Sequence, residues 1–302
     1  MGDKVLVTGA TGFVGRAALA ALHLRGHDVV GASRTADERA NVVACDLLDP
    51  AQVDALIETH RPTHLLHLAW DVTHGRYWAA PSNLVWLRAS LLLLERFVAA
   101  GGRRAVVAGT CAEYNWSYGY CSEDVTPYAP ATLYGVAKAA LRDVMTGFSA
   151  EQGLSAAWGH VFFPYGPGES AQRLVGGTIS SLLRGEPARC SAGTQLRDYQ
   201  HVADTGDALA ALLCSDVVGA VNIASGQPVA VATVVTEIAR QLGCPELLQL
   251  GALPSRPGDP PLVVGDVRKL TEQVSWKPRF GLQAGIADTI AWWRDRLGSQ
   301  GE

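Results

Sequence analysis

A short strand-like segment that runs directly into a glycine-rich turn and a helical pattern is the feature that most restricts the fold of this chain. Lys4–Thr8 is rich in strand-forming residues, Gly9–Gly15 contains three glycines, and Phe13–Leu24 has a helical pattern. The glycines allow a tight turn that brings backbone amides against an anion at the start of the helix. This order predicts the pyrophosphate-binding unit of a dinucleotide-binding sheet.

Further short apolar segments alternate with helical patterns along the first half of the chain. Such alternation is typical of βαβ units, so we expect an α/β fold: a doubly wound parallel sheet (Rossmann fold) with helices on both faces. The expected strands are residues 28–32, 41–45, 64–68 and 104–108, and the expected helices are residues 51–59, 83–100 and 132–152.

The regular alternation ends near Phe163, where glycine and proline become frequent. Helical patterns return at residues 174–184, 204–214, 231–242 and 282–297. We therefore predict a dinucleotide-binding domain over residues 1–163 and a smaller C-terminal substrate-binding region over residues 164–302. This division leaves open whether strands of the second part return to the main sheet.

Composition and charge argue against several classes of protein. The chain has 302 residues, 48% of them hydrophobic and 18% charged, as in an ordinary globular protein. A net charge of −4 does not indicate the positive surface that nucleic-acid binding requires. The six cysteines are scattered, which suggests neither a metal site nor disulfides. The most apolar helical stretch has four residues, too few to span a membrane, and no secretory leader precedes the first strand. We expect a cytoplasmic protein that binds no metal, nucleic acid or membrane.

The end of the second expected strand favours NADP over NAD. An NAD enzyme usually has an acidic residue there, which binds the ribose 2′-hydroxyl. This chain has Gly31–Thr35 instead, without an acid. Ser33 can donate a hydrogen bond to a 2′-phosphate, and Arg34 can pair with it. The alternative for Arg34 is an ordinary solvated loop charge.

Tyr134 and Lys138 are four residues apart at the start of an expected helix, which places the phenol and the ammonium on one face. A nearby ammonium lowers the pKa of a phenol from its ordinary value of roughly 10 and makes it a better acid–base at neutral pH. Thr110 closes an expected strand where its hydroxyl can share a substrate oxygen with Tyr134. These three are the candidate catalytic residues.

Taken in order, these motifs resemble the extended short-chain dehydrogenase/reductase family, in its nucleotide-sugar epimerase/dehydratase group. The resemblance includes Cys45–Leu47 and His67–Ala69 and continues to Trp276–Pro278, so it covers nearly the whole chain. It implies that the cofactor is bound by Gly9, Thr11, Gly12, Phe13, Val14, Gly15, Ser33, Arg34, Asp46, Leu47, Leu68, Ala69, Tyr134 and Lys138.

The same resemblance implies a nucleotide-diphosphate sugar as the substrate. Arginines can neutralise a diphosphate through paired hydrogen bonds. The expected substrate-binding residues are Trp70, Glu113, Arg173, Arg197 and Arg256. The alternatives are surface ion pairs for the arginines and an internally hydrogen-bonded loop carboxylate for Glu113. Whether the protein forms a homodimer stays open.

One departure from the family narrows the reaction. Its sugar 4,6-dehydratases have Asp-Glu directly after the catalytic threonine, where this chain has Cys111 and Ala112. A methyl group cannot transfer a proton, so dehydration by that route is not expected. The segment resembles 4-ketoreductases of nucleotide 4-keto-6-deoxysugars, which implies NADPH-dependent reduction, at C4, in deoxysugar biosynthesis. Two alternatives remain: a 4-epimerase that retains its cofactor, and a non-catalytic NADP-binding regulator.

Overall fold

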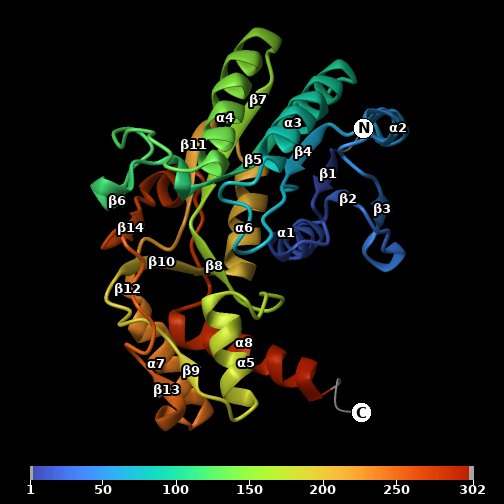
Figure 1. Ribbon diagram of the computed structural model, residues 1–302. Helices are drawn as coiled ribbons and strands as arrows, with labels where there is room; N and C mark the ends of the chain where they lie inside the picture. Colours follow the sequence, from blue (N-terminus) through green and yellow to red (C-terminus); the bar gives the residue numbers. More distant parts are fainter. Residues whose placement is uncertain (1–2, 299–302) are drawn as a thin grey trace.

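A seven-stranded sheet forms the larger part of the molecule in the computed structural model, which describes residues 3–298 (Figure 1). The strand order is β11-β7-β5-β4-β1-β2-β3, and every neighbouring pair is parallel. The predicted doubly wound parallel sheet is therefore confirmed. Its strands are β1 (Lys4–Thr8), β2 (Asp28–Ser33), β3 (Val42–Ala44), β4 (His64–His67), β5 (Arg104–Thr110), β7 (Ser155–Val161) and β11 (Gly219–Ile223).

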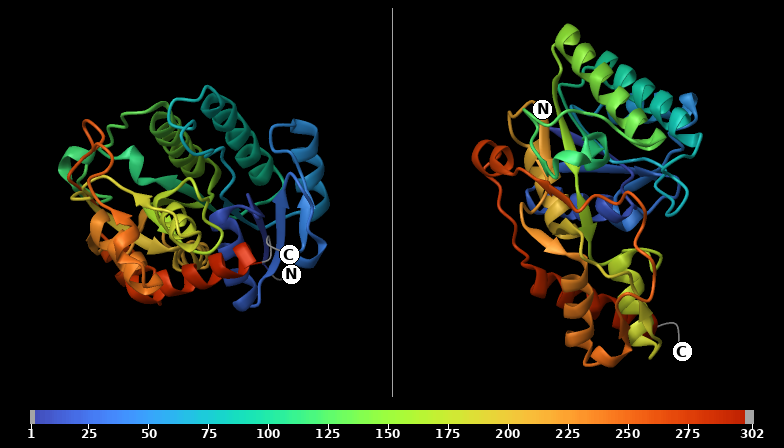
Figure 2. Two further views of the ribbon diagram at one scale, coloured as in Figure 1. Left: turned by 60° about the horizontal axis from the view of Figure 1, so that its bottom comes forward. Right: turned by 60° about the vertical axis from the view of Figure 1, so that its left-hand side comes forward.

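Helices cover both faces of this sheet, because its strands are apolar on both sides. Along β1, Val5 and Val7 pack on one face with α1 and α6, while Leu6 packs on the other with α2, α3 and α4. Figure 2 shows α3 and α4 side by side on their face. The helices are α1 (Phe13–Leu24), α2 (Pro50–His60), α3 (Ser82–Ala99), α4 (Leu133–Gln152) and α6 (Val202–Leu213).

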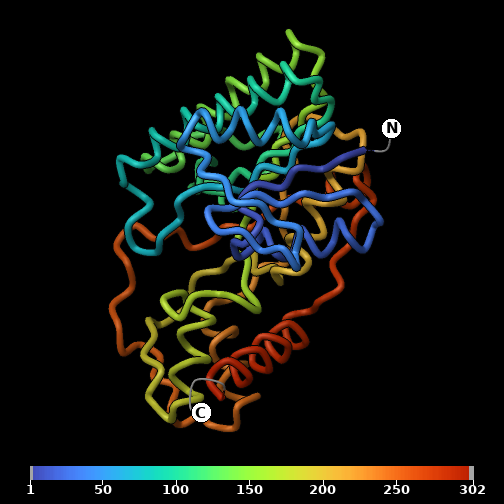
Figure 3. The backbone as a smooth tube through the Cα atoms, turned by 90° about the vertical axis from the view of Figure 1, so that its right-hand side faces the viewer, coloured from blue at the N-terminus to red at the C-terminus, as the bar shows by residue number. Residues whose placement is uncertain are grey.

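A smaller part lies beneath the main sheet (Figure 3). It has a sheet in the order β12-β10-β14-β6, with β8 paired to β10, and a two-stranded sheet of β13 and β9. Its helices α5, α7 and α8 share one apolar cluster. The elements are β6 (Tyr120–Cys121), β8 (Phe163–Tyr165), β9 (Ala188–Arg189), β10 (Leu196–His201), β12 (Pro228–Ala230), β13 (Leu248–Gln249), β14 (Leu262–Gly265), α5 (Leu174–Leu183), α7 (Val231–Leu242) and α8 (Leu282–Gly298).

The chain crosses between the two parts more than once. β11 and α6 follow residue 163 in the sequence, yet β11 pairs with β7 and α6 packs against the main sheet. In the opposite direction, β6 precedes residue 163 and pairs with β14 in the small sheet. The predicted domain boundary between residues 163 and 164 thus stays a prediction. In the structure each part contains segments from both sides of that boundary.

Two features are absent from residues 3–298. No helix there is long and apolar enough to cross a bilayer. No group of three or more His, Cys, Asp or Glu side chains in the same range is arranged to hold a metal ion.

Candidate cofactor and catalytic site

The glycine-rich turn between β1 and α1 forms a cradle that side chains would fill. Gly9 has a φ of +69°, and a Cβ on it would lie 2.8 Å from the backbone nitrogen of Ala69. A Cβ on Gly15 would collide with the carbonyl oxygen of Gly9. Gly12 caps α1 and offers no side-chain acceptor to the first-turn N–H groups, whose positive end attracts anions. This cradle fits the pyrophosphate of a dinucleotide.

The end of β2 presents hydroxyl groups and one cation. Thr11 Oγ1 donates to Ser33 Oγ at 3.0 Å, which links the glycine-rich turn to β2. Ser33 Oγ in turn donates to the Thr35 carbonyl at 2.8 Å. Arg34 is exposed beside them, and residues 31–35 contain no carboxylate. This end of the strand is therefore chemically suited to a phosphate on the adenosine ribose.

The other expected cofactor residues lie at the same edge of the sheet. Asp46 and Leu47 follow β3, and Leu68 and Ala69 follow β4. The Leu68 N–H donates to the carbonyl oxygen of Thr8, the last residue of β1, at 3.2 Å. Because all these strands are parallel, their carboxyl ends form one edge, where open α/β sheets bind ligands.

The three candidate catalytic residues come together beside this edge. Thr110 ends β5, and its side chain lies beside the phenol of Tyr134, in the first turn of α4, and acts to lower the pKa of that phenol. One turn further on, the Lys138 ammonium donates to the carbonyl oxygen of Ala108 at 2.8 Å and lies 4.0 Å from the ring centre of Trp70. The two residues are thus on one helix face, as their spacing predicts.

Burial controls the pKa values of this pair. It raises the pKa of Tyr134 above the ordinary value; Tyr77 adds to the rise, and the hydrogen bond with Thr110 opposes it. Burial also lowers the pKa of Lys138 to about 7, against the charge of Glu113. The prediction of a pKa below the ordinary value for this phenol is therefore wrong. Loss of water around the buried phenol is the largest effect on its pKa.

Aromatic side chains surround the Tyr134 ring. Tyr77 and Trp78 lie edge-on to it, with ring centres 4.9 and 5.8 Å away, and Trp70 lies at 6.4 Å. Trp70 is half-buried and donates to Asn83 Oδ1 at 2.8 Å. Sequence reasoning identified Trp70 but missed Tyr77 and Trp78, although this aromatic pair between an expected strand and an expected helix was a visible signal.

The expected arginines belong to the smaller part of the molecule or to its loops. Arg197, on β10, forms an ion pair with Asp259 at 2.6 Å. Arg173 forms an ion pair with Glu169 at 3.2 Å and donates to the Pro164 carbonyl. Arg256 is exposed.

The charges of these arginines act on two partly buried tyrosines, Tyr77 and Tyr199. Burial raises the pKa of Tyr77 to about 12, and the charges of Arg173 and Arg256 oppose that rise. Arg197 and Arg173 act in the same way on Tyr199, whose pKa burial raises. Arg173 and Arg256 thus lower the pKa of Tyr77, whose ring contacts that of Tyr134. Arg173 and Arg197 both lower the pKa of Tyr199.

Glu113 has the alternative role that the sequence left open, that of a carboxylate hydrogen-bonded inside the protein. Its side chain has 0% exposure, and its carboxylate accepts hydrogen bonds from the Thr110 backbone, Trp158 and Arg142. The predicted substrate contact is not met, because internal donors enclose the group completely. Cys111 and Ala112 are also buried, and burial raises the pKa of the Cys111 thiol well above its usual value.

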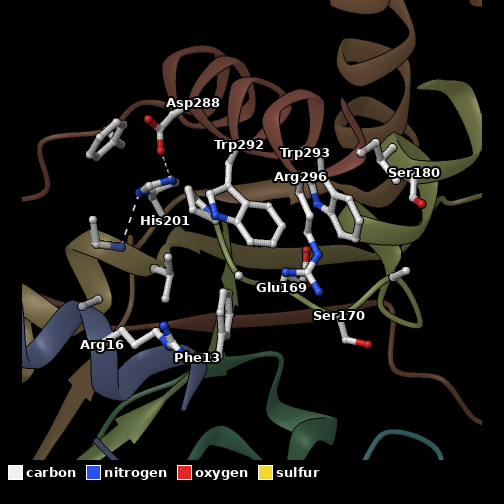
Figure 4. Close-up of a pocket in the computed structure, with 18 of the residues that line it drawn as sticks. Phe13, Arg16, Glu169, Ser170, Ser180, His201, Asp288, Trp292, Trp293 and Arg296 are labelled. Carbon is white, nitrogen blue, oxygen red and sulfur yellow. Dashed lines mark hydrogen bonds and ion pairs between the residues drawn. The ribbon is translucent and has the colours of Figure 1, made fainter. Parts of the chain in front are cut away.

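A cavity of about 1010 Å³ lies between α1 and α8, and the expected cofactor residues Thr11 and Phe13 are in its lining (Figure 4). Phe13 and Arg16 line it from α1, and Trp292 and Trp293 line it from α8. None of the three candidate catalytic residues lines it. We therefore locate the chemistry at the carboxyl ends of the strands, where the glycine cradle and Tyr134 lie.

Comparison with known proteins shows which family and which fold this chain shares. The model of the "NAD dependent epimerase/dehydratase family" matches residues 5–224. The dTDP-glucose 4,6-dehydratase of Xanthomonas campestris pv. campestris is 27% identical, over 95% of this chain and 92% of its own. The UDP-glucose 4-epimerase of Thermus thermophilus, solved with NAD, is 26% identical with a TM-score of 0.85, covering 96% and 99%. MoeE5, solved with UDP-glucuronic acid and NAD, is 33% identical with a TM-score of 0.84, covering 98% and 100%.

Proposed function

The chain belongs to the NAD-dependent epimerase/dehydratase family, and from this premise we propose that it uses NADPH to reduce the keto group, at C4, of a nucleotide-activated 4-keto-6-deoxysugar. The observation that carries the proposal is the Tyr134–Thr110 pair. A buried phenol with a raised pKa stays protonated at neutral pH, and here the Thr110 side chain lies beside it. The two residues after Thr110 offer no further acid or base, since Ala112 has a methyl group and Cys111 is a buried thiol with a raised pKa.

The proposed chemistry assigns one task to each of the three residues. When bound, the nicotinamide supplies a hydride to the carbonyl carbon. Thr110 orients the carbonyl oxygen by a hydrogen bond, and Tyr134 donates its proton to that oxygen as negative charge develops on it. Lys138 holds the nicotinamide ribose. One hydride and one proton add to the carbonyl, so the product is the alcohol.

Binding of the nucleotide would align the sugar with these groups. Arg173, Arg197 and Arg256 are the proposed partners of the diphosphate, and Trp70 is a proposed wall of the sugar subsite. Contacts far from the reacting carbon supply binding free energy that orients it. The relatives' names support this substrate class, because they specify dTDP-glucose, UDP-glucose and UDP-glucuronic acid.

A substrate screen tests the proposal. Several nucleotide 4-keto-6-deoxysugars would be incubated with the protein and NADPH, followed by stereochemical analysis of the products. We expect stoichiometric oxidation of NADPH with at least one of them. No turnover with any keto sugar, together with tight NADP binding, would favour the non-catalytic regulator instead.

A 4-epimerase is the second candidate, because the solved relatives include a UDP-glucose 4-epimerase holding NAD. An epimerase oxidises and re-reduces C4 with a retained cofactor. It would interconvert a UDP-hexose and its C4 epimer without net consumption of NADPH, which separates it from the reductase.

Arg34→Ala is expected to reduce the preference for NADPH over NADH. The substitution removes the exposed cation next to Ser33, so NADPH should bind more weakly while NADH is nearly unaffected. Dissociation constants for both dinucleotides, measured by fluorescence, would test this. Arg39→Ala, another exposed arginine a few residues along, is the matched control. Equal weakening of both cofactors by Arg34→Ala would mean that Arg34 is structural.

The protein is expected not to dehydrate a nucleotide hexose that keeps its 6-hydroxyl. Elimination of water needs an acid and a base beside the sugar, and Cys111 and Ala112 stand at those positions. Incubation with dTDP-glucose and NAD should give no 4-keto-6-deoxy product, detected by its ultraviolet absorbance in base. The Xanthomonas dehydratase serves as the positive control. Appearance of that absorbance with this protein would reverse the interpretation.

A further inference from the structure

Glu113 is a buried acid for which the proposed reaction has no task. It ends the short 3₁₀ turn Cys111–Glu113 that follows β5, with 0% of its side chain exposed. Burying a carboxylate is unfavourable unless the group is paired and hydrogen-bonded. The partners of Glu113 therefore indicate what its charge does.

These partners come from three elements. Oε1 accepts from the backbone N–H of Thr110 at 2.9 Å and from Trp158 Nε1 at 3.0 Å. Oε2 accepts from Arg142 Nη1 at 3.1 Å, and His160 Nδ1 lies 3.4 Å from Oε1. Burial raises the pKa of Glu113, but the charges of His160 and Arg142 and these hydrogen bonds hold it below its usual value. The carboxylate is thus ionised.

Thr110 connects this carboxylate to the site. Its backbone N–H donates to Glu113 Oε1 at 2.9 Å, and its side chain lies beside the phenol of Tyr134. Its Oγ1 also accepts from the Ala112 N–H at 3.2 Å, which fixes its rotamer. A displacement of Glu113 would therefore move the hydroxyl that orients the substrate oxygen.

Glu113 also lies against the face of α4 that carries Lys138, because its Oε2 binds Arg142, which is one helical turn after Lys138. Within residues 3–298, the Lys138 ammonium has no carboxylate at ion-pair distance; it contacts the Ala108 carbonyl and the Trp70 ring. Glu113 raises the pKa of Lys138 against the burial that lowers it.

The other titratable groups facing Tyr134 and Lys138 are Tyr77, Cys111 and His67. His67 is neutral, because burial lowers its pKa to about 3.

We propose that Glu113, held by Arg142, His160 and Trp158, is a positioning residue of the proposed reductase: it fixes Thr110 from behind and supplies the negative charge that keeps Lys138 an ammonium ion. This inference rests on the proposed function, and the proposed function does not require it.

Glu113→Gln tests the inference, because the amide is nearly isosteric and keeps an oxygen for Thr110. We expect kcat to fall by roughly tenfold, about the effect of one hydrogen bond in the transition state, with KM nearly unchanged. Removing the negative charge lowers the pKa values of both Lys138 and Tyr134, and reduction needs both protonated. The basic limb of the kcat profile should therefore move to lower pH by roughly one unit.

Asp204→Asn is the matched control. Asp204 is equally buried, accepts from the backbone N–H groups of Arg279 and Phe280, and lies 3.7 Å from the Arg279 guanidinium. Its neutralisation should cost stability and leave the basic limb in place. A shift of the same size in this control would mean that the effect is a general one of losing a buried charge, and would overturn the proposal.

Two more variants make the test sharper. Combining Glu113→Gln with Thr110→Val should cost less than the two losses together if Glu113 acts through the Thr110 hydroxyl. Arg142→Gln leaves the carboxylate and removes its cation, so the limb should move to higher pH. This variant also serves if Glu113→Gln does not fold. Two results would overturn the proposal. One is that the losses of kcat in Glu113→Gln and Thr110→Val are additive; the other is that the basic limb of the kcat profile does not move in Glu113→Gln or, if that variant does not fold, in Arg142→Gln.

NADPH binding separates failure of this inference from failure of the proposed function. In the wild type, affinity should weaken as the pH rises through the pKa of Lys138, about 7. Glu113→Gln should move that midpoint lower, and this can be measured without any sugar. If no keto sugar is reduced but the midpoint moves, the proposed function fails and the link from Glu113 to Lys138 holds. If reduction occurs and neither the midpoint nor the basic limb moves, the inference about Glu113 fails.

Discussion

Tyr134→Phe is expected to lower kcat by about 10²–10⁴-fold, the usual contribution of a general acid. Hydride addition leaves developing negative charge on the sugar oxygen, and the Tyr134 phenol is the group we propose to protonate it. The substitution keeps the ring and its packing against Trp70, Tyr77 and Trp78, so folding and NADPH binding should survive. Steady-state rates with NADPH and a keto sugar, and the NADPH dissociation constant, would test both statements.

Two further variants control this experiment. Thr110→Val should cost less than Tyr134→Phe, because it removes an orienting hydrogen bond but leaves the acid. Tyr165→Phe removes a buried phenol hydroxyl that bonds the Leu282 carbonyl in the smaller part of the molecule, and it should leave kcat close to that of the wild type. A near-normal kcat for Tyr134→Phe would remove the tyrosine from the mechanism, and the reductase proposal would then lose its main support.

Lys138→Met is expected to weaken NADPH binding and to remove the pH dependence of that binding. Burial lowers the pKa of Lys138 to about 7, so its positive charge is present below that pH and is lost as the pH rises through it. In the wild type, NADPH should therefore bind more tightly at pH 6 than at pH 8. Methionine has similar bulk and no charge. The affinity of the Lys138→Met variant for NADPH should therefore be low and nearly independent of pH between pH 6 and pH 8.

A fluorescence titration of NADPH at several pH values would measure this effect. Lys4→Met is a matched control on β1, since it removes a lysine far along the strand from the carboxyl edge. A pH dependence retained in Lys138→Met would show that another group titrates, and Lys138 would then not be the cation at the ribose.

Much of the main sheet is local in origin, and the sequence alone predicts it. The apolar run at Lys4–Thr8 and the helical pattern at Phe13–Leu24 have the same bounds in the structure as in the prediction. The turn between them requires glycine at two positions, because any Cβ at Gly9 or Gly15 would collide with the backbone. Signals of this kind depend on residues within one turn or strand, so no tertiary information is needed.

The strand β7 shows where such reasoning stops. Ser155–Val161 contains alanine, glycine, tryptophan and histidine but few β-branched residues, and no strand was expected there. In the structure it pairs with β5 over seven residues and with β11 from the C-terminal half. Its strand conformation comes from neighbours far away in the sequence, which local propensity does not report.

The sequence by itself determined the strand–turn–helix cradle, the absence of an acid at the end of β2, and the pairing of Tyr134 with Lys138 on one helix face. The tertiary structure decided the charge environment of that pair. Spacing along a helix gives proximity, but a pKa depends on the water removed by every element packed around the group. Glu113 comes from one loop and its charge raises the pKa of Lys138, while Trp70 and Tyr77 come from another loop and pack against Lys138 and Tyr134. For that reason the pKa of the phenol is raised, where the spacing alone predicted that it would be lowered.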